Sequence, residues 1–260
     1  MHPHDGIHCY LDDTPHYWDN FWNPPNEILG KTIDSSIDPD LVSRTLIHDS
    51  ISLWNDIPLP NNKHLQLSEH YPRGVIVSQN AGILFSNDSI TASFRGRRQC
   101  PYVIQQAAES LGIEKWHQYV ERHLKETYTI GGSIIFPRHR NSINQMRGFN
   151  RNIQDRWDLT LQCIKDYYNG KDSPIGWCIE QDKKFFDLFG SFEGYVDFFL
   201  LNDCVESDYE VIDWMPDTVL PRDTDEFFMY MGKQDEFVRK RNERITSLDP
   251  LRDPVNPLDI

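Results

Sequence analysis

Arginine and aspartate side chains recur over one short stretch of the chain, and their spacing makes it the best candidate for a site. The positions Arg151, Asp155, Asp158 and Gln162 follow steps of four, three and four. Such steps place side chains on one face of an α-helix, so we predict a helix that starts near residue 151 and carries a polar stripe. Arg147, just upstream, is expected to fold over this stripe.

The chemistry that suits such a stripe is the binding of an anion. The planar fork of arginine gives bidentate hydrogen bonds to phosphate or carboxylate groups, and an adjacent aspartate can act as a base or as a metal ligand. We therefore expect an anionic small molecule or a protein partner to bind here. The candidate ligand-binding residues are Arg147, Arg151, Asp155, Asp158, Gln162, Asn144 and His139.

A structural role explains the same residues equally well. Arg151 and Asp155 are spaced as an ordinary helical ion pair, which contributes about 0.3 kcal/mol on an exposed face. Alternatively, the arginines and aspartates form a buried network that only holds the fold together. His139 lies between Arg138 and Arg140. Its position is explained equally well by a charged surface loop and by a binding site. With a structural network, the chain would be an acidic interaction or inhibitor protein.

A third interpretation is a toxin- or defence-like enzyme that acts on RNA or on a nucleotide. Arg151-Asn152 resembles the Arg-Asn pair of HEPN-type ribonucleases, but no His follows in the same predicted helix. The sequence also contains no nucleophile elbow, P-loop or dinucleotide-binding fingerprint.

We predict no cofactor, with a divalent metal expected only if the enzyme interpretation holds. The N-terminal histidines resemble a metal-binding tract by number alone: His2, His4, His8 and His16.

Composition limits the class of protein. The chain has 260 residues, 38% of them hydrophobic and 12% aromatic, which is enough for a buried core. A net charge of −14 argues against a general nucleic-acid surface. The five cysteines contain no Cys-x-x-Cys pair, so they indicate neither a zinc ribbon nor a disulfide framework. Because no apolar run approaches the roughly 20 residues of a membrane span and no secretory signal is visible, we expect a cytoplasmic protein and no membrane partner.

Hydrophobic patterning predicts the elements of the first half of the chain. Asp40 to Trp54 is expected to be helical, and short β-rich pieces within 74–94 alternate with turn-forming residues, as in a hairpin or small antiparallel sheet. Tyr102 to Tyr128 has a helical composition that breaks near Gly112. Ile130 to Phe136 is predicted to be a strand, with two glycines whose simplest use is close packing at its start.

After residue 150 the chain is predicted to be mainly helical. The helix near 151 should bury a stripe at steps of three and four, which contains Ile153, Trp157, Leu161, Ile164 and Tyr168. The last helix, about Thr224 to Ser247, should bury one side, made of Phe227, Met231, Val238 and Ile245. Its polar side is expected to hold Glu236, Arg239, Lys240, Arg241, Glu243 and Arg244.

These elements predict an α+β fold, in which a small antiparallel sheet precedes a mainly helical C-terminal half in a single compact unit. We expect an irregular N-terminal arm over residues 1–35, one domain over 36–248, and an extended proline-containing tail over 249–260.

Several ordered motifs resemble those of a widespread bacterial family of unknown function. They span about residues 35–246 and include Ile130-Gly-Gly-Ser-Ile-Ile-Phe-Pro, Ser142-Ile-Asn followed by Arg147-Gly, Asp155-Arg-Trp-Asp-Leu-Thr-Leu and Gly194-Tyr-Val-Asp-Phe-Phe. The resemblance implies a bacterial or phage-borne protein, and it implies no reaction and no catalytic residue.

Overall fold

The computed structural model of the chain describes residues 39–70, 75–90, 99–127 and 129–248. The statements below concern that part of the chain. The predicted N-terminal arm with its histidines and the predicted proline-containing tail lie outside it.

The sheet has four antiparallel strands in the order β1-β2-β3-β4. Their bounds are β1 Leu67–His70, β2 Val75–Ser78, β3 Ile83–Ser89 and β4 Ser133–Pro137. The predicted hairpin is confirmed as β2 and β3, with Ile76 opposite Phe85 and Gly82 at a positive φ of 63° in the turn. Strand β1 was not predicted, because Leu67-Ser-Glu-His has no alternation of apolar and polar residues.

Helices account for most of the remaining structure. The longer ones are α3 Pro39–Asp56, α4 Gln99–Leu111, α5 Ile113–Thr127, α7 Trp157–Tyr168 and α11 Thr224–Leu248. The shorter ones are α6 Ile143–Phe149, α8 Gly176–Gln181, α9 Lys183–Phe186 and α10 Phe192–Phe198, together with the 3-10 turns η1 Ile130–Gly132, η2 Asp187–Phe189 and η3 Asn202–Cys204. The predicted break near Gly112 is confirmed, since Gly112 has a φ of 75° between α4 and α5.

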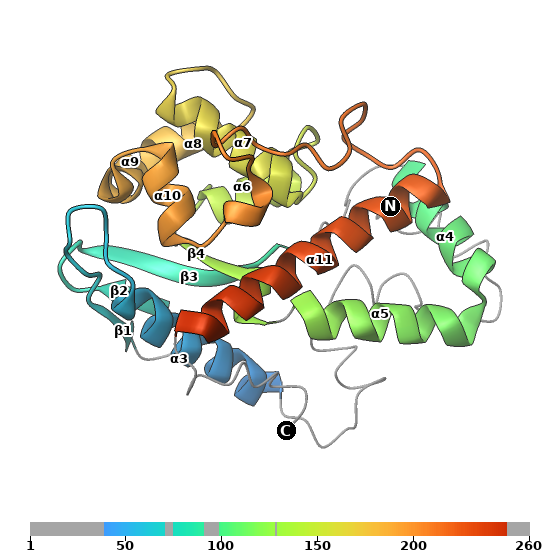
Figure 1. The fold of residues 1–260 in the computed structure, drawn as a ribbon, viewed down its shortest axis with the longest axis horizontal. Helices are drawn as coiled ribbons and strands as arrows, with labels where there is room; N and C mark the ends of the chain where they lie inside the picture. The colour runs from blue at the N-terminus through green and yellow to red at the C-terminus, as the bar shows by residue number, and fades with distance from the viewer. Residues whose placement is uncertain (1–38, 71–74, 91–98, 128, 249–260) are drawn as a thin grey trace.

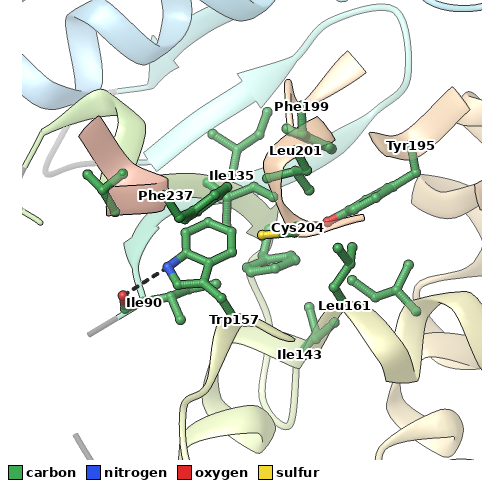
Figure 2. Packing of buried hydrophobic residues seen from close by; sticks show 14 of the residues in the cluster. Ile90, Ile135, Ile143, Trp157, Leu161, Tyr195, Phe199, Leu201, Cys204 and Phe237 are labelled. Carbon is green, nitrogen blue, oxygen red and sulfur yellow. Dashed lines mark hydrogen bonds between the residues drawn. The ribbon is translucent and has the colours of Figure 1, made fainter. Parts of the chain in front are cut away.

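Figure 1 shows helices α6 to α10 gathered on one side of the sheet and α3 on the other, while α11 crosses the molecule diagonally toward α4 and α5. This arrangement confirms the α+β fold with a mainly helical C-terminal half. One hydrophobic core joins these layers, and aromatic rings fill much of it. In Figure 2 the indole of Trp157 points into this core and donates to the carbonyl of Ile90 over 3.1 Å.

The glycines before β4 are required by close packing, as predicted. A Cβ on Gly132 would lie 1.9 Å from the carbonyl oxygen of Thr127, and one on Gly131 would lie 2.4 Å from the side chain of Asn242. Asn242 instead accepts a 2.8 Å hydrogen bond from the Gly131 N–H. The start of β4 is therefore held directly against α11.

The polar side predicted for the last helix is wrong at Arg241, which is fully buried. Its guanidinium donates to the carbonyl of Phe199 over 3.0 Å, of Gly131 over 2.7 Å and of Ser133 over 2.8 Å. It also lies over the rings of Trp54 and Trp157, at 5.6 and 5.5 Å from their centroids. Arg241 thus belongs to the buried face of α11.

Candidate functional site

The predicted polar stripe does not form, because helix α7 begins at Trp157 and not near Arg151. Residues 151–155 form turns, and Gln154 and Asp155 have positive φ values of 53° and 62°. Two consecutive residues of this conformation cannot belong to a right-handed helix. The Asp155 N–H donates to the carbonyl of Arg147 over 3.2 Å. Asp155 is thereby turned toward α6, away from Asp158.

Arg147 lies at the centre of one charged cluster, between the sheet and the turn that precedes α7. Only 3% of its side chain is exposed, and its guanidinium forms ion pairs with Asp88 on β3 and with Asp155. It also lies 6.0 Å from the ring centroid of Phe136 on β4. Arg147 therefore ties α6 and the turn to strands β3 and β4.

Asn144, one turn earlier on α6, makes a similar link to the sheet. Its amide donates to the hydroxyl of Ser86 on β3 over 2.9 Å, and its carbonyl oxygen accepts from Ser142. The candidate residues Arg147 and Asn144 thus attach the same helix to the same strand.

Asp158 belongs to a second charged cluster, which is more deeply buried. It pairs with Arg156, and the two side chains are 1% and 0% exposed. Asp158 also accepts from the Trp214 N–H over 2.9 Å and from the Tyr230 hydroxyl over 3.4 Å. Arg156 additionally contacts Asp213 at 3.0 Å. Sequence reasoning missed Arg156 as the partner, because the predicted helix from residue 151 contains both residues, and residues two positions apart on a helix do not face each other.

The electrostatics of this second cluster favour the charged form of Arg156. Burial is the largest single effect and would lower the pKa of Arg156, but the hydrogen bond to Asp158 and the electrostatic effects of Asp158, Asp213 and Tyr230 together outweigh burial and raise that pKa. The guanidinium also donates to the carbonyl of Thr218 over 2.7 Å. Arg147, Asp155 and Asp158 are accordingly engaged inside the protein, which is the arrangement that the structural interpretation requires.

His139 connects the loop after β4 with the end of α8. Its Nε2 lies 2.7 Å from the buried carboxylate of Asp182, and its Nδ1 lies 2.8 Å from the carbonyl of Arg140. Burial would lower the pKa of His139, but the hydrogen bonds to Arg140 and Asp182 outweigh it and raise that pKa. Because both ring nitrogens face acceptors, His139 is built to hold the loop and not to take a proton from a substrate.

Asn141 in the same loop has a φ of 67°, a conformation that asparagine and glycine tolerate better than other residues. We expect Asn141→Gly to leave the free energy of unfolding within about 0.5 kcal/mol, and Asn141→Val to lower it by about 1–2 kcal/mol. Urea titration of the two variants measures the difference. Equal stability of the glycine and valine variants would contradict the role of this backbone conformation.

The two remaining candidates lie nearer the surface. Arg151 is exposed, and no described residue forms an ion pair or a hydrogen bond with its guanidinium. Gln162 is half-buried on α7 and donates to Asp166 over 2.9 Å. The structure therefore does not bring the seven candidates into one site.

Helices α6 and α8 form a paired surface that sequence reasoning did not identify. The Asn150 side chain donates to the Pro174 carbonyl over 3.2 Å, which ties the end of α6 to the start of α8. The bond between His139 and Asp182 ties the loop before α6 to the end of α8. The two helices thus pack in opposite directions on one side of the sheet.

Four of the exposed residues on this pair and on the segments beside α6 define what we call the α6–α8 surface, which consists of Arg140, Phe149, Arg151 and Trp177. Phe149 is 78% exposed and Trp177 is 49% exposed. Phe149 ends α6 and Trp177 lies in the first turn of α8, so both rings lie at the end that also carries Arg151. The sequence already indicated that Phe149 is exposed, because this residue precedes Ile153, where the predicted apolar stripe begins.

Comparison with known proteins identifies the chain at the family level. A family described as "Family of unknown function (DUF6994)" matches residues 28–245. The chain belongs to this family. The match confirms the expected membership of a family of unknown function. No curated protein and no solved structure matches the chain.

Two further observations bear on this DUF6994 member. None of its described helices is long and apolar enough to cross a membrane. Within the described ranges, no three His, Cys, Asp or Glu side chains gather in a group that could hold a metal ion.

Proposed function

We propose that this protein binds an anionic ligand on its α6–α8 surface, through Arg140 and Arg151. One observation carries the proposal. Two other exposed arginines are neutralised by neighbouring carboxylates, Arg222 by Glu226 and Arg239 by Glu243, and the exposed Arg122 lies over the ring of Tyr119. Among the described residues, the guanidinium groups of Arg140 and Arg151 have no such partner.

The positions of these arginines support an external anion. Arg140 lies in the loop held by His139, and Arg151 lies just after α6, so the two charges mark opposite ends of the helix. A seven-residue helix is about 10 Å long, which is a span that one small ligand can bridge. On a chain of net charge −14, exposed arginines without carboxylate partners favour a negatively charged ligand.

The buried clusters have a supporting role in this proposal. Arg147 fixes α6 to the sheet, and the pair of Arg156 and Asp158 fixes the start of α7. Arg151 lies between these two fixed points, so its backbone is held in place before a ligand arrives. Such preorganisation reduces the entropic cost of binding.

We further propose that the protein is bacterial or phage-borne and works in the cytoplasm. The motifs that resemble a bacterial family support its origin. Three buried cysteines, Cys163, Cys178 and Cys204, are free thiols, which suits a reducing compartment. An enzymatic role is less well supported, since Asp158 is 1% exposed and a general base must reach its substrate.

Isothermal titration with sodium pyrophosphate at low ionic strength tests the binding proposal. We expect the wild-type protein to bind pyrophosphate, with an affinity that falls as salt is added. Arg151→Gln should weaken binding about tenfold, because a charge-assisted hydrogen bond is lost.

Arg239→Gln is the matched control, since it also removes one exposed arginine charge. It should leave the affinity for pyrophosphate unchanged. The proposal fails if the wild-type protein does not bind, or if both variants lose the same affinity.

A further inference from the structure

The α6–α8 surface carries two large aromatic rings in addition to its arginines. Phe149 is the most exposed of the large hydrophobic residues that the structure describes. The hydrogen bond from Asn150 to Pro174 brings the end of α6, where Phe149 lies, next to the start of α8, where Trp177 lies. The backbone positions of the two residues therefore belong to one region of the surface, although 28 positions separate them in the sequence.

Single exposed hydrophobic residues are normal on a protein surface, but this region combines two rings with a cation. Arg151 follows Phe149 by two positions. Most other aromatic side chains of the described chain are packed against one another, as in the contacts of Phe185 with Phe189 and of Trp54 with Phe199, although Tyr102 on α4 is also exposed. The core thus takes up most of the rings, whereas Phe149 and Trp177 are left at the surface beside a guanidinium.

Exposed aromatic rings next to arginine are suited to one class of anion in particular. Every nucleobase has a flat face that stacks on aromatic side chains, and the attached phosphate pairs with arginine. We propose that the ligand is a nucleotide whose base stacks on Phe149 and Trp177 while its phosphate pairs with Arg151. This inference rests on the proposed anion site and names the class of its ligand.

Charge limits the size of this ligand. The net charge of −14 disfavours a long polynucleotide, which needs many basic contacts along its backbone. In addition to burial, Glu180, on the next turn of α8 after Trp177, is close enough to Tyr167 on α7 to help raise the pKa of that tyrosine. Its carboxylate is therefore directed toward α7. Arg140, at the other end of α6, is available for a further phosphate group.

A pair of probes with the same phosphate tests the role of the base. Adenosine 5′-monophosphate and ribose 5-phosphate are titrated into the full-length protein by calorimetry under identical low-salt conditions. We expect the nucleotide to bind at least about tenfold more tightly, because stacking contributes only when the base is present.

Two variants locate the stacking site. Trp177→Leu and Phe149→Leu should each reduce the advantage of the nucleotide over the sugar phosphate, while leaving the affinity for ribose 5-phosphate unchanged. Tyr102→Leu is the control, because Tyr102 is 60% exposed on the separate helix α4. Thermal melting of each variant confirms that it is folded.

The outcomes separate this inference from the proposed function. Equal affinity for the two probes would overturn the proposal that the ligand is a nucleotide, while the proposed anion site would stand. Binding of neither probe overturns the nucleotide, and the pyrophosphate titration then decides whether the anion site also falls. A nucleotide preference that survives both leucine substitutions, or that the Tyr102 variant loses, overturns the assignment of the base to this surface.

Discussion

Asp158→Asn is expected to lower the free energy of unfolding by about 3–5 kcal/mol, because it leaves a buried arginine without its closest counter-charge. The side chain of Arg156 is 0% exposed, and its remaining partner Asp213 is 44% exposed. The asparagine keeps the shape of the side chain but loses the charge. Since small domains have a total stability of about 5–15 kcal/mol, the variant should lose a large fraction of its stability.

Urea unfolding followed by tryptophan fluorescence measures this effect. The matched control is Asp187→Asn, which breaks the ion pair of Asp187 with Lys183, where both side chains are more than half exposed. Such surface pairs contribute about 0–1 kcal/mol, so the control should remain close to the wild type.

A double variant distinguishes a structural pair from a site residue. Arg156→Met combined with Asp158→Asn removes both charges, and its loss of stability should be smaller than the sum of the two single losses. A loss below about 1 kcal/mol for Asp158→Asn alone would contradict this prediction and restore Asp158 as a candidate for binding or catalysis.

Arg241→Met is expected to lower the free energy of unfolding by about 3 kcal/mol. Three carbonyl oxygens lose their donor, and each buried acceptor without a partner costs about 1–3 kcal/mol. Part of this cost is offset, because burial already lowers the pKa of Arg241 to about 10 and methionine removes that buried charge. The hydrogen bonds should outweigh the charge, because they connect β4, the end of α10 and α11.

Arg239→Met is the control on the same helix, since Arg239 is exposed and pairs with the exposed Glu243. It should change stability by less than about 1 kcal/mol. Arg241→Lys keeps the charge but not the fork of donors, so its stability should fall between that of the wild type and that of the methionine variant. If Arg241→Met were as stable as the wild type, the cost of the buried charge would equal the gain from its hydrogen bonds.

The sequence predicted those elements whose signals are local. Turn-forming residues between two apolar segments predicted the hairpin. The conformational freedom of Gly112 predicted the break between α4 and α5, and the spacing of apolar residues predicted the last helix. The start of α7 was wrong because a tertiary contact decides it. Asp155 pairs with Arg147 and adopts a positive φ, which local helix spacing does not reveal.

The candidate site was predicted less well than the fold, because charge alone does not reveal burial. Arg241 follows Val238 by three positions and precedes Ile245 by four, so it continues the apolar stripe of α11. Its spacing therefore indicated burial, whereas its residue type suggested exposure. Residue type likewise made Arg147 and Asp158 candidates for a ligand site, and the structure places both in internal ion pairs.

The position of Arg241 affects when this protein can fold during its synthesis. The guanidinium satisfies carbonyls of Gly131, Ser133 and Phe199, but it comes from a helix that is synthesised after all of them. On the ribosome, the sheet and the helices up to α10 are made while the space later occupied by α11 is still open to solvent. The complete hydrophobic core, with these hydrogen bonds, can form only after residue 241 has emerged from the ribosomal exit tunnel. Folding of the described part of the chain should therefore wait for α11, and the elements that precede this helix should stay accessible to chaperones until it has been synthesised.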